Sequence, residues 1–213
     1  MFYYPYYDII ANCCRQQPIT SAIRVLHASP NTPSIDVYAN GNIIAKNLAY
    51  KEFLKYIPIP SGNYNIKIYT SGEIINPIIN TIIYIPEHTV SNLASIGEPL
   101  DTSLHTIPEP VLAQNLKSPC IRFVNLSPNS PAVDIKLSDG TKIIGNVAYK
   151  EITNYLCAPS ETYSFIITPT GSNNVLLAVP NLQLHSNNYY TMYLVGLVEK
   201  SPYLEILLAP EPR

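Results

Sequence analysis

The strongest constraint on the fold is an internal repeat that covers most of the chain. The stretch "AIRVLHASPNTPSIDVY" (22–38) recurs as "CIRFVNLSPNSPAVDIK" (120–136). Further on, "NLAYKEFLKYIPIPSGNY" (47–64) recurs as "NVAYKEITNYLCAPSETY" (146–163) after a one-residue insertion. Two stretches that recur in the same order indicate two structural units of one kind.

The boundaries of the two units follow from a shared ending. Pro108-Glu109-Pro110 closes the first copy and Pro210-Glu211-Pro212 closes the second. A chain of 213 residues has room for two domains of about 100 residues each. We therefore predict an N-terminal connector at 1–19, repeat 1 at 20–110, a linker at 111–117 and repeat 2 at 118–213.

Each repeat consists of short segments that are typical of β-strands. Segments such as "IRVLHA", "SIDVYA" and "PIINTIIYI" are rich in β-branched and aromatic residues and are bounded by Ser-Pro, Asn-Gly or Ser-Gly pairs. No segment shows the sustained period of about 3.6 residues that indicates an amphipathic helix. The pattern predicts an all-β protein of two tandem antiparallel immunoglobulin-like β-sandwich domains with an extended N-terminal leader.

Composition excludes two kinds of partner. Charged residues make up 13% of the chain, against about 25% in an average globular protein, and the formal net charge is −2. No cluster of Lys and Arg provides the positive surface that nucleic acid requires. No stretch reaches the roughly 18 apolar residues of a membrane-spanning helix. We expect no nucleic-acid partner and no membrane span.

The repeated residues also carry a family resemblance. The stretches "RVLHASP" (24–30), "PSIDV" (33–37) and "AYKE" (49–52) resemble the pattern of the bacterial domain-of-unknown-function family 4397, which recurs in tandem on exported proteins. The resemblance covers both copies, although repeat 2 has Asn125 and Leu126 where the pattern prefers His-Ala. It implies a β-sandwich and a role in the cell envelope, and it supplies no catalytic residue.

Charged residues that recur in both copies are candidates for structural roles. Arg24 and Asp36 recur as Arg122 and Asp134, on segments that we expect to be neighbouring strands. We predict that each pair is a structural ion pair or a turn brace. The four histidines lie far apart, and the common nucleophile, zinc, phosphate-loop and Cys-x-x-Cys motifs are missing. We expect no catalytic residue, no metal site, no cofactor and no enzyme activity.

Aromatic residues fall into two groups. Two tyrosine positions in the first copy recur in the second, and we expect these four tyrosines in the cores or at the corners of the sandwiches. A second group precedes both repeats, and we predict that it docks on another molecule; docking on its own domain is the alternative. The recurring tyrosines are Tyr50, Tyr64, Tyr149 and Tyr163, and the docking segment contains Phe2, Tyr3, Tyr4, Tyr6 and Tyr7.

Two adjacent cysteines, Cys13 and Cys14, stand between the docking segment and repeat 1. Adjacent cysteines rarely bond to each other, because the small ring strains the intervening peptide. The remaining cysteines are Cys120 and Cys157, and neither has a counterpart in repeat 1. The alternatives are reduced thiols, with Cys120 and Cys157 buried, and a zinc site. For zinc, no Cys or His stands at the usual short spacing from the adjacent pair.

A cysteine-bearing leader before a β-sandwich is similar in layout, though not in sequence, to the endospore appendage subunits of spore-forming bacteria. This resemblance implies a connector that reaches a neighbouring subunit, with Cys13 and Cys14 as donors and Cys120 and Cys157 as acceptors of intermolecular disulfides. The start of the chain has no basic region and no uninterrupted apolar stretch. We therefore expect synthesis in the cytoplasm without a signal peptide and location at a bacterial cell surface or spore surface.

These features together predict the function. We expect a structural subunit that forms a head-to-tail homopolymer, because a contact that does not close produces a filament. Other surface or spore-coat proteins are further expected partners. The alternative is a non-catalytic β-sandwich module that binds a glycan or the cell envelope.

Overall fold

The structure is a computed structural model that describes residues 20–109 and 117–211, and every regular element in these ranges is a β-strand. No helix in the described ranges is long and apolar enough to cross a membrane. The first domain contains β1 (Thr20–His27), β2 (Ile35–Ala39), β3 (Asn42–Leu48), β4 (Ile57–Pro60), β5 (Gly62–Thr70), β6 (Ile79–Ile85), β7 (Val90–Ile96) and β8 (Ser103–Glu109). The second contains β9 (Cys120–Asn125), β10 (Val133–Leu137), β11 (Lys142–Val147), β12 (Leu156–Cys157), β13 (Thr162–Pro169), β14 (Leu177–Gln183), β15 (Tyr189–Leu197) and β16 (Lys200–Pro210).

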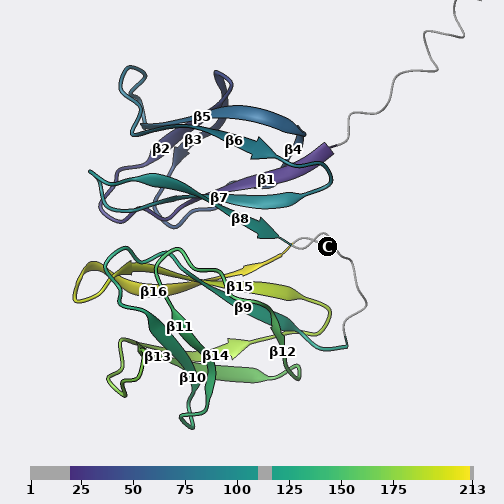
Figure 1. Ribbon diagram of the computed structural model, residues 1–213, viewed down its shortest axis with the longest axis vertical. Helices are drawn as coiled ribbons and strands as arrows, with labels where there is room; N and C mark the ends of the chain where they lie inside the picture. Colours follow the sequence, from purple (N-terminus) through teal and green to yellow (C-terminus); the bar gives the residue numbers. More distant parts are fainter. Residues whose placement is uncertain (1–19, 110–116, 212–213) are drawn as a thin grey trace, which may run out of the picture.

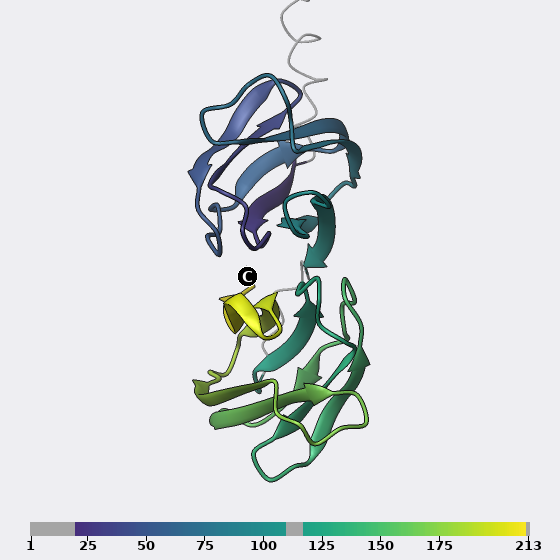
Figure 2. The same cartoon turned by 90° about the vertical axis from the view of Figure 1, so that its left-hand side faces the viewer.

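Each domain is a sandwich of two four-stranded sheets. The inner sheets, which face the other domain, have the orders β4-β1-β7-β8 and β12-β9-β15-β16. The outer sheets have the orders β3-β2-β5-β6 and β11-β10-β13-β14. Figures 1 and 2 show the two sandwiches one above the other along the long axis of the molecule. The predicted all-β fold with two sandwich domains is therefore confirmed.

One strand pair in each inner sheet is parallel. β1 pairs with β7 and β9 pairs with β15 in parallel register, whereas the other pairs are antiparallel. This detail differs from the purely antiparallel sheets that the sequence predicts. The strands of a parallel pair come from opposite ends of a repeat, so short-range turn signals in the sequence do not reveal their pairing.

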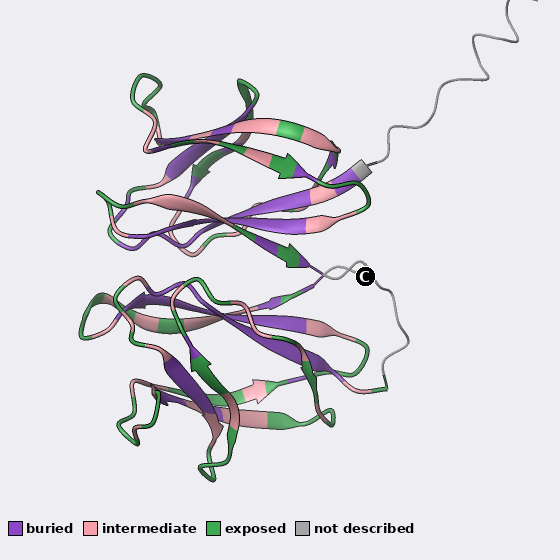
Figure 3. Ribbon diagram, viewed as in Figure 1, coloured by how far each residue is buried: buried purple, intermediate pink, exposed green. Residues whose placement is uncertain are grey.

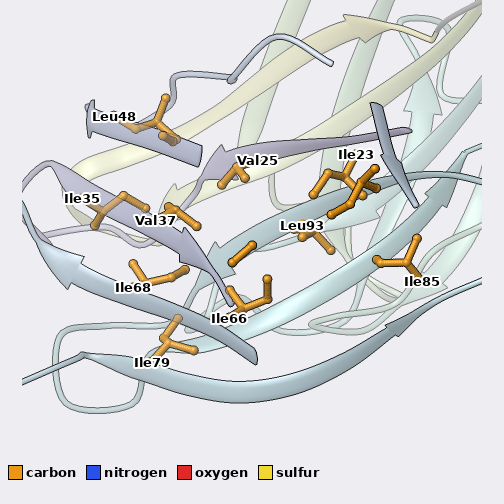
Figure 4. Packing of buried hydrophobic residues seen from close by; sticks show 13 residues of the cluster. Ile23, Val25, Ile35, Val37, Leu48, Ile66, Ile68, Ile79, Ile85 and Leu93 are labelled. Atoms are coloured by element: carbon orange, nitrogen blue, oxygen red, sulfur yellow. The ribbon is translucent and has the colours of Figure 1, made fainter. Parts of the chain in front are cut away.

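Alternating aliphatic side chains fill the core of each sandwich. In the first domain, Ile23 and Val25 on β1 pack against Leu93 on β7 and against Ile66 and Ile68 on β5 (Figure 4). This spacing of two residues is the period of a strand with one face in the core. Burial of each such side chain contributes about 1.5–3 kcal/mol. The equivalent core of the second domain includes Ile121, Phe123, Val133, Ile135, Ile167 and Met192.

The central strands of the inner sheets are buried on both faces (Figure 3). A strand with this pattern lies between two packed layers. The second layer is the other domain, because a third apolar cluster contains residues from both inner sheets. The two repeats therefore pack sheet against sheet. This interdomain cluster includes Leu26, Ala94, Ile96 and Ile107 from the first domain and Val124, Leu126, Tyr193 and Val195 from the second.

Candidate functional site

Arg24 lies in the interface between the domains. Its neighbours on β1, Ile23 and Val25, point into the core of the first domain, so the Arg24 side chain points to the opposite face of the sheet. There its Nη2 atom lies 2.8 Å from Oε1 of Glu109 and 4.0 Å from Oε2 of Glu211. Arg24 therefore binds the closing glutamates of both repeats.

Asp36 lies on the far side of the same sandwich. Its neighbours on β2, Ile35 and Val37, also point into the core, so Asp36 faces outward from the outer sheet. The whole core separates Asp36 from Arg24. Of the two alternatives predicted for Arg24 and Asp36, the ion pair is therefore wrong.

Arg122 repeats the orientation of Arg24 in the second domain. Its Nη2 atom lies 3.4 Å from Oε1 of Glu211, and its Nη1 and Nε groups donate hydrogen bonds of 2.7 Å to the carbonyl oxygen of Pro108 and to Oγ1 of Thr191. The bond to Pro108 crosses from one domain to the other. Of the two alternatives predicted for Arg122 and Asp134, the ion pair is wrong for the same reason as in repeat 1.

Two equivalent tyrosines complete this interface cluster, which we define as Arg24, Glu109, Arg122, Glu211 and the two rings. The hydroxyl of Tyr56 donates to Oε2 of Glu109, and the Arg24 guanidinium lies 4.8 Å from the centre of the Tyr56 ring. The Arg122 guanidinium lies 4.9 Å from the centre of the Tyr155 ring. Each ring face attracts the guanidinium that lies against it.

Burial controls the charges of the interface cluster. Burial, and after it the nearby Glu211 carboxylate, raise the pKa of Glu109, while Arg24 and the hydrogen bond from Tyr56 oppose the change; the net pKa is about 8. Burial lowers the pKa of Arg24, but the combined attraction to Glu109, Tyr193, Tyr56 and Glu211 outweighs this effect and raises the pKa overall. The charged side chains are at most 6% exposed, so they bind one another and not a ligand in solvent. The arrangement fixes one domain against the other.

The two aspartates brace turns within their own domains. Asp36 accepts hydrogen bonds from the N–H of Asn47 at 2.7 Å, the hydroxyl of Ser71 at 3.1 Å and the N–H of Gly72 at 3.2 Å. It thereby joins β3 to the turn after β5. Asn47 has a φ of 52°, which is an uncommon backbone conformation that the bond helps to hold. The equivalent Asp134 accepts from the N–H groups of Asn146 and Gly171 at 2.9 and 3.3 Å and lies 3.5 Å from Nζ of Lys142.

The recurring tyrosines lie at corners and at the domain interface. The hydroxyl of Tyr64 donates to the carbonyl of Pro60 at 2.8 Å, and Tyr163 donates to Pro159 at 3.0 Å. Each bond closes the corner between two successive strands. Tyr50 stacks edge-on against His27, and Tyr149 packs against the interdomain cluster.

Cys120 and Cys157 form a disulfide within one chain. They lie opposite each other on the paired strands β9 and β12, and this pairing brings the two sulfur atoms together. The prediction that Cys120 and Cys157 accept disulfides from another chain is therefore corrected. The other predicted assembly residues, Cys13, Cys14, Phe2, Tyr3, Tyr4, Tyr6 and Tyr7, lie outside the described residues.

Sequence reasoning missed an exposed apolar edge on the first domain. β6 is the last strand of its sheet, and its Ile82 and Tyr84 are 70% and 61% exposed. The equivalent positions on β14 are Asn181 and Gln183, and Pro180 and a register shift interrupt that strand. Comparison of "INTIIYI" with "LAVPNLQ" would have revealed this difference.

In the described ranges, no three His, Cys, Asp or Glu side chains are arranged to bind a metal ion. A family model described as "Domain of unknown function (DUF4397)" matches residues 21–136 and 121–211. No curated protein matches the sequence.

Two solved structures show weak similarity. One is "The Bacillus anthracis TIE protein", with 8% identity and a TM-score of 0.27 over 84% of this chain and 34% of that chain. The chain thus spans about a third of that structure's length. The other is a CBM26 module from Eubacterium rectale Amy13K in complex with maltoheptaose, with 9% identity and a TM-score of 0.27 over 91% of this chain and 98% of that chain. Neither similarity bears on function.

Proposed function

This chain belongs to the DUF4397 family, and from that premise we propose that it is a non-enzymatic structural subunit that self-assembles into a fibre at a bacterial cell surface or spore surface. The observation that carries the proposal is that the polar side chains shared by both repeats contact other groups of the same chain. The arginines and closing glutamates join the two domains, the aspartates brace turns, and two tyrosine pairs serve corners and the interface. Polar side chains that bind one another inside the molecule favour a rigid building block.

The exposed edge of the first domain supports self-association. An edge strand presents unpaired N–H and C=O groups to solvent, and natural proteins commonly protect it with Pro, a bulge or charge. β14 has this protection in Pro180 and the register shift, whereas β6 pairs with β5 in continuous register and exposes Ile82 and Tyr84. Exposed apolar side chains beside an open edge favour contact with another protein.

Residues 1–19 supply the proposed connector between subunits. Because Cys120 and Cys157 bind each other, the cysteines left for links between chains are Cys13 and Cys14 of separate copies. A covalent link keeps subunits at a high effective concentration after non-covalent contacts break. A disulfide between connectors therefore adds durability to the assembly.

Electron microscopy and light scattering of the purified full-length protein test the proposal. We expect filaments or a ladder of multimers, and we expect a reductant to lower their resistance to detergent and heat. A variant with Cys13→Ser and Cys14→Ser should assemble but dissociate in detergent without reductant. A protein that stays monomeric at all concentrations and binds a glycan would instead support the alternative binding module.

A further inference from the structure

An apolar pocket opens in the second domain between the two sheets, beside β12. Its volume is about 270 Å³, and it reaches the surface beside Leu156 and Cys157, which are exposed. Deeper in the pocket, the side chains of Ile121, Phe165 and Leu184 form an apolar wall. No lining residue carries a charge, so the pocket fits an apolar ligand group.

The pocket exists because repeat 2 has a smaller side chain where repeat 1 fills its core. Ala158 lines the pocket, and the equivalent residue in repeat 1 is Ile59, which is only 7% exposed and belongs to the core cluster. The strand is also shorter in repeat 2: β4 has four residues and includes Ile59, whereas β12 has two and ends before Ala158. The missing aliphatic atoms leave a space that opens to the surface.

The size and chemistry of the pocket suit an aromatic ring. An apolar cavity of ~150 Å³ lined by aliphatic and aromatic side chains is large enough to bind benzene. The pocket exceeds that volume and can therefore hold one tyrosine or phenylalanine ring. A tyrosine can bury its ring there and keep its hydroxyl in the water at the mouth.

We infer that this pocket binds an aromatic side chain from residues 2–7 of a second copy of the chain. This segment has an aromatic residue at five of its six positions, and among the residues outside the described ranges only 1–19 contain any aromatic residue. Tyr7 precedes the start of β1 by 13 residues, which span up to about 45 Å when extended.

The positions of the segment and the pocket fit a head-to-tail contact. The segment is attached to the first domain, at the start of β1, and the pocket belongs to the second domain. A contact between two different surfaces of successive copies is heterologous and can continue without closing. This inference rests on the proposed self-assembly and specifies one of its contacts.

A pocket-filling substitution tests the contact in the full-length chain. Ala158→Ile places in repeat 2 the residue that repeat 1 already accommodates, so we expect the fold to remain intact by circular dichroism and thermal unfolding. We expect self-association, measured by sedimentation, to weaken about tenfold or more. The matched control is Ala148→Ile, which adds the same atoms at an exposed position in the loop after β11 and should leave association unchanged. Equal association of both variants and the wild type would overturn the inference.

A second measurement identifies the occupant without altering the pocket. A photo-reactive benzoylphenylalanine replaces Tyr6, and cross-linked peptides are mapped by mass spectrometry. We expect a product of twice the monomer mass that joins residue 6 to the segment 156–165. A cross-link within one chain, or to another region, would overturn the assignment to a second copy.

Failure of this inference can be separated from failure of the proposed function. If the wild type assembles and Ala158→Ile assembles equally well, the pocket is not a contact but the fibre proposal stands. If the wild type never assembles, both are wrong. A variant with serine at Phe2, Tyr3, Tyr4, Tyr6 and Tyr7 provides an independent check, because these positions precede both repeats in the sequence. We expect this variant to weaken self-association to the same extent as Ala158→Ile.

Discussion

Asp36 is a buried carboxylate that binds backbone groups instead of a cation. Burial alone would raise its pKa, but the hydrogen bonds from Asn47, Gly72 and Ser71 and the nearby charge of Lys46 together outweigh that effect and lower the pKa. Asp36→Ala leaves these N–H groups without their acceptor, so we expect the free energy of unfolding to fall by about 1–3 kcal/mol. Denaturant unfolding measures this loss. Because the folded-state pKa is lowered, the stabilisation is present at neutral pH and disappears as the pH falls through that pKa.

Asp139→Ala is the matched control for Asp36→Ala. Asp139 also accepts a backbone hydrogen bond, from Thr141 at 2.8 Å, but it lies in an exposed turn. We expect its removal to leave the unfolding midpoint unchanged. Asp134→Ala should behave like Asp36→Ala in the second domain, and equally small effects of all three substitutions would contradict the brace.

At the scale of residues, the sequence predicts which side chains matter but not which ones meet. The recurrence of Arg24 and Asp36 correctly marks both as structural. Their partners could not be predicted, because the partner of Arg24 is a glutamate near the end of the repeat and the partners of Asp36 are backbone groups. The partners of Arg24 and of Asp36 depend on the face of the sheet to which each side chain points. That face is determined only when the two sheets pack against each other.

The element that distinguishes the repeats most is the last strand of each outer sheet. Ile82→Asn gives β6 the residue that β14 has at the equivalent position. Because Ile82 is exposed, we expect thermal unfolding to stay unchanged, while self-association weakens about tenfold by light scattering. The control is Val175→Asn, which removes an exposed valine from a loop of the second domain. If Val175→Asn weakens self-association as much as Ile82→Asn does, the loss comes from replacing any exposed apolar side chain and not from a contact at the β6 edge.

At the scale of elements, the strands were predictable and their neighbours were not. Segments such as "SIDVYA" and "PIINTIIYI" correspond to β2 and β6 because β-branched residues between turn signals favour strands. The sequences of these segments do not indicate that β6 is the edge strand of its sheet or that β1 and β7 pair in parallel. The sequence also does not indicate that Cys120 and Cys157 lie opposite each other, since β9 and β12 are separated by the whole outer-sheet hairpin of β10 and β11.

At the scale of the whole molecule, two sandwiches share one continuous stack of four sheets. The apolar cluster between the inner sheets removes one face of each sheet from solvent, so each domain depends on the other for full burial. The interface cluster of Arg24, Glu109, Arg122 and Glu211 lies in the same contact, where unpaired charges would be costly. We therefore expect the two domains to unfold together.

The charge state of Glu109 makes the stability of this stack depend on pH. Its pKa is about 8 in the folded protein and near 4.5 in the unfolded chain, so between these values the folded state holds a proton that the unfolded state releases. The free energy of unfolding therefore decreases as the pH rises from 5 to 9. Calorimetry should show a falling midpoint, by about 2–4 °C for each 1 kcal/mol lost. Glu109→Gln cannot ionise and should abolish the part of the decrease that Glu109 causes. An identical pH profile for variant and wild type would mean that Arg24 keeps Glu109 ionised.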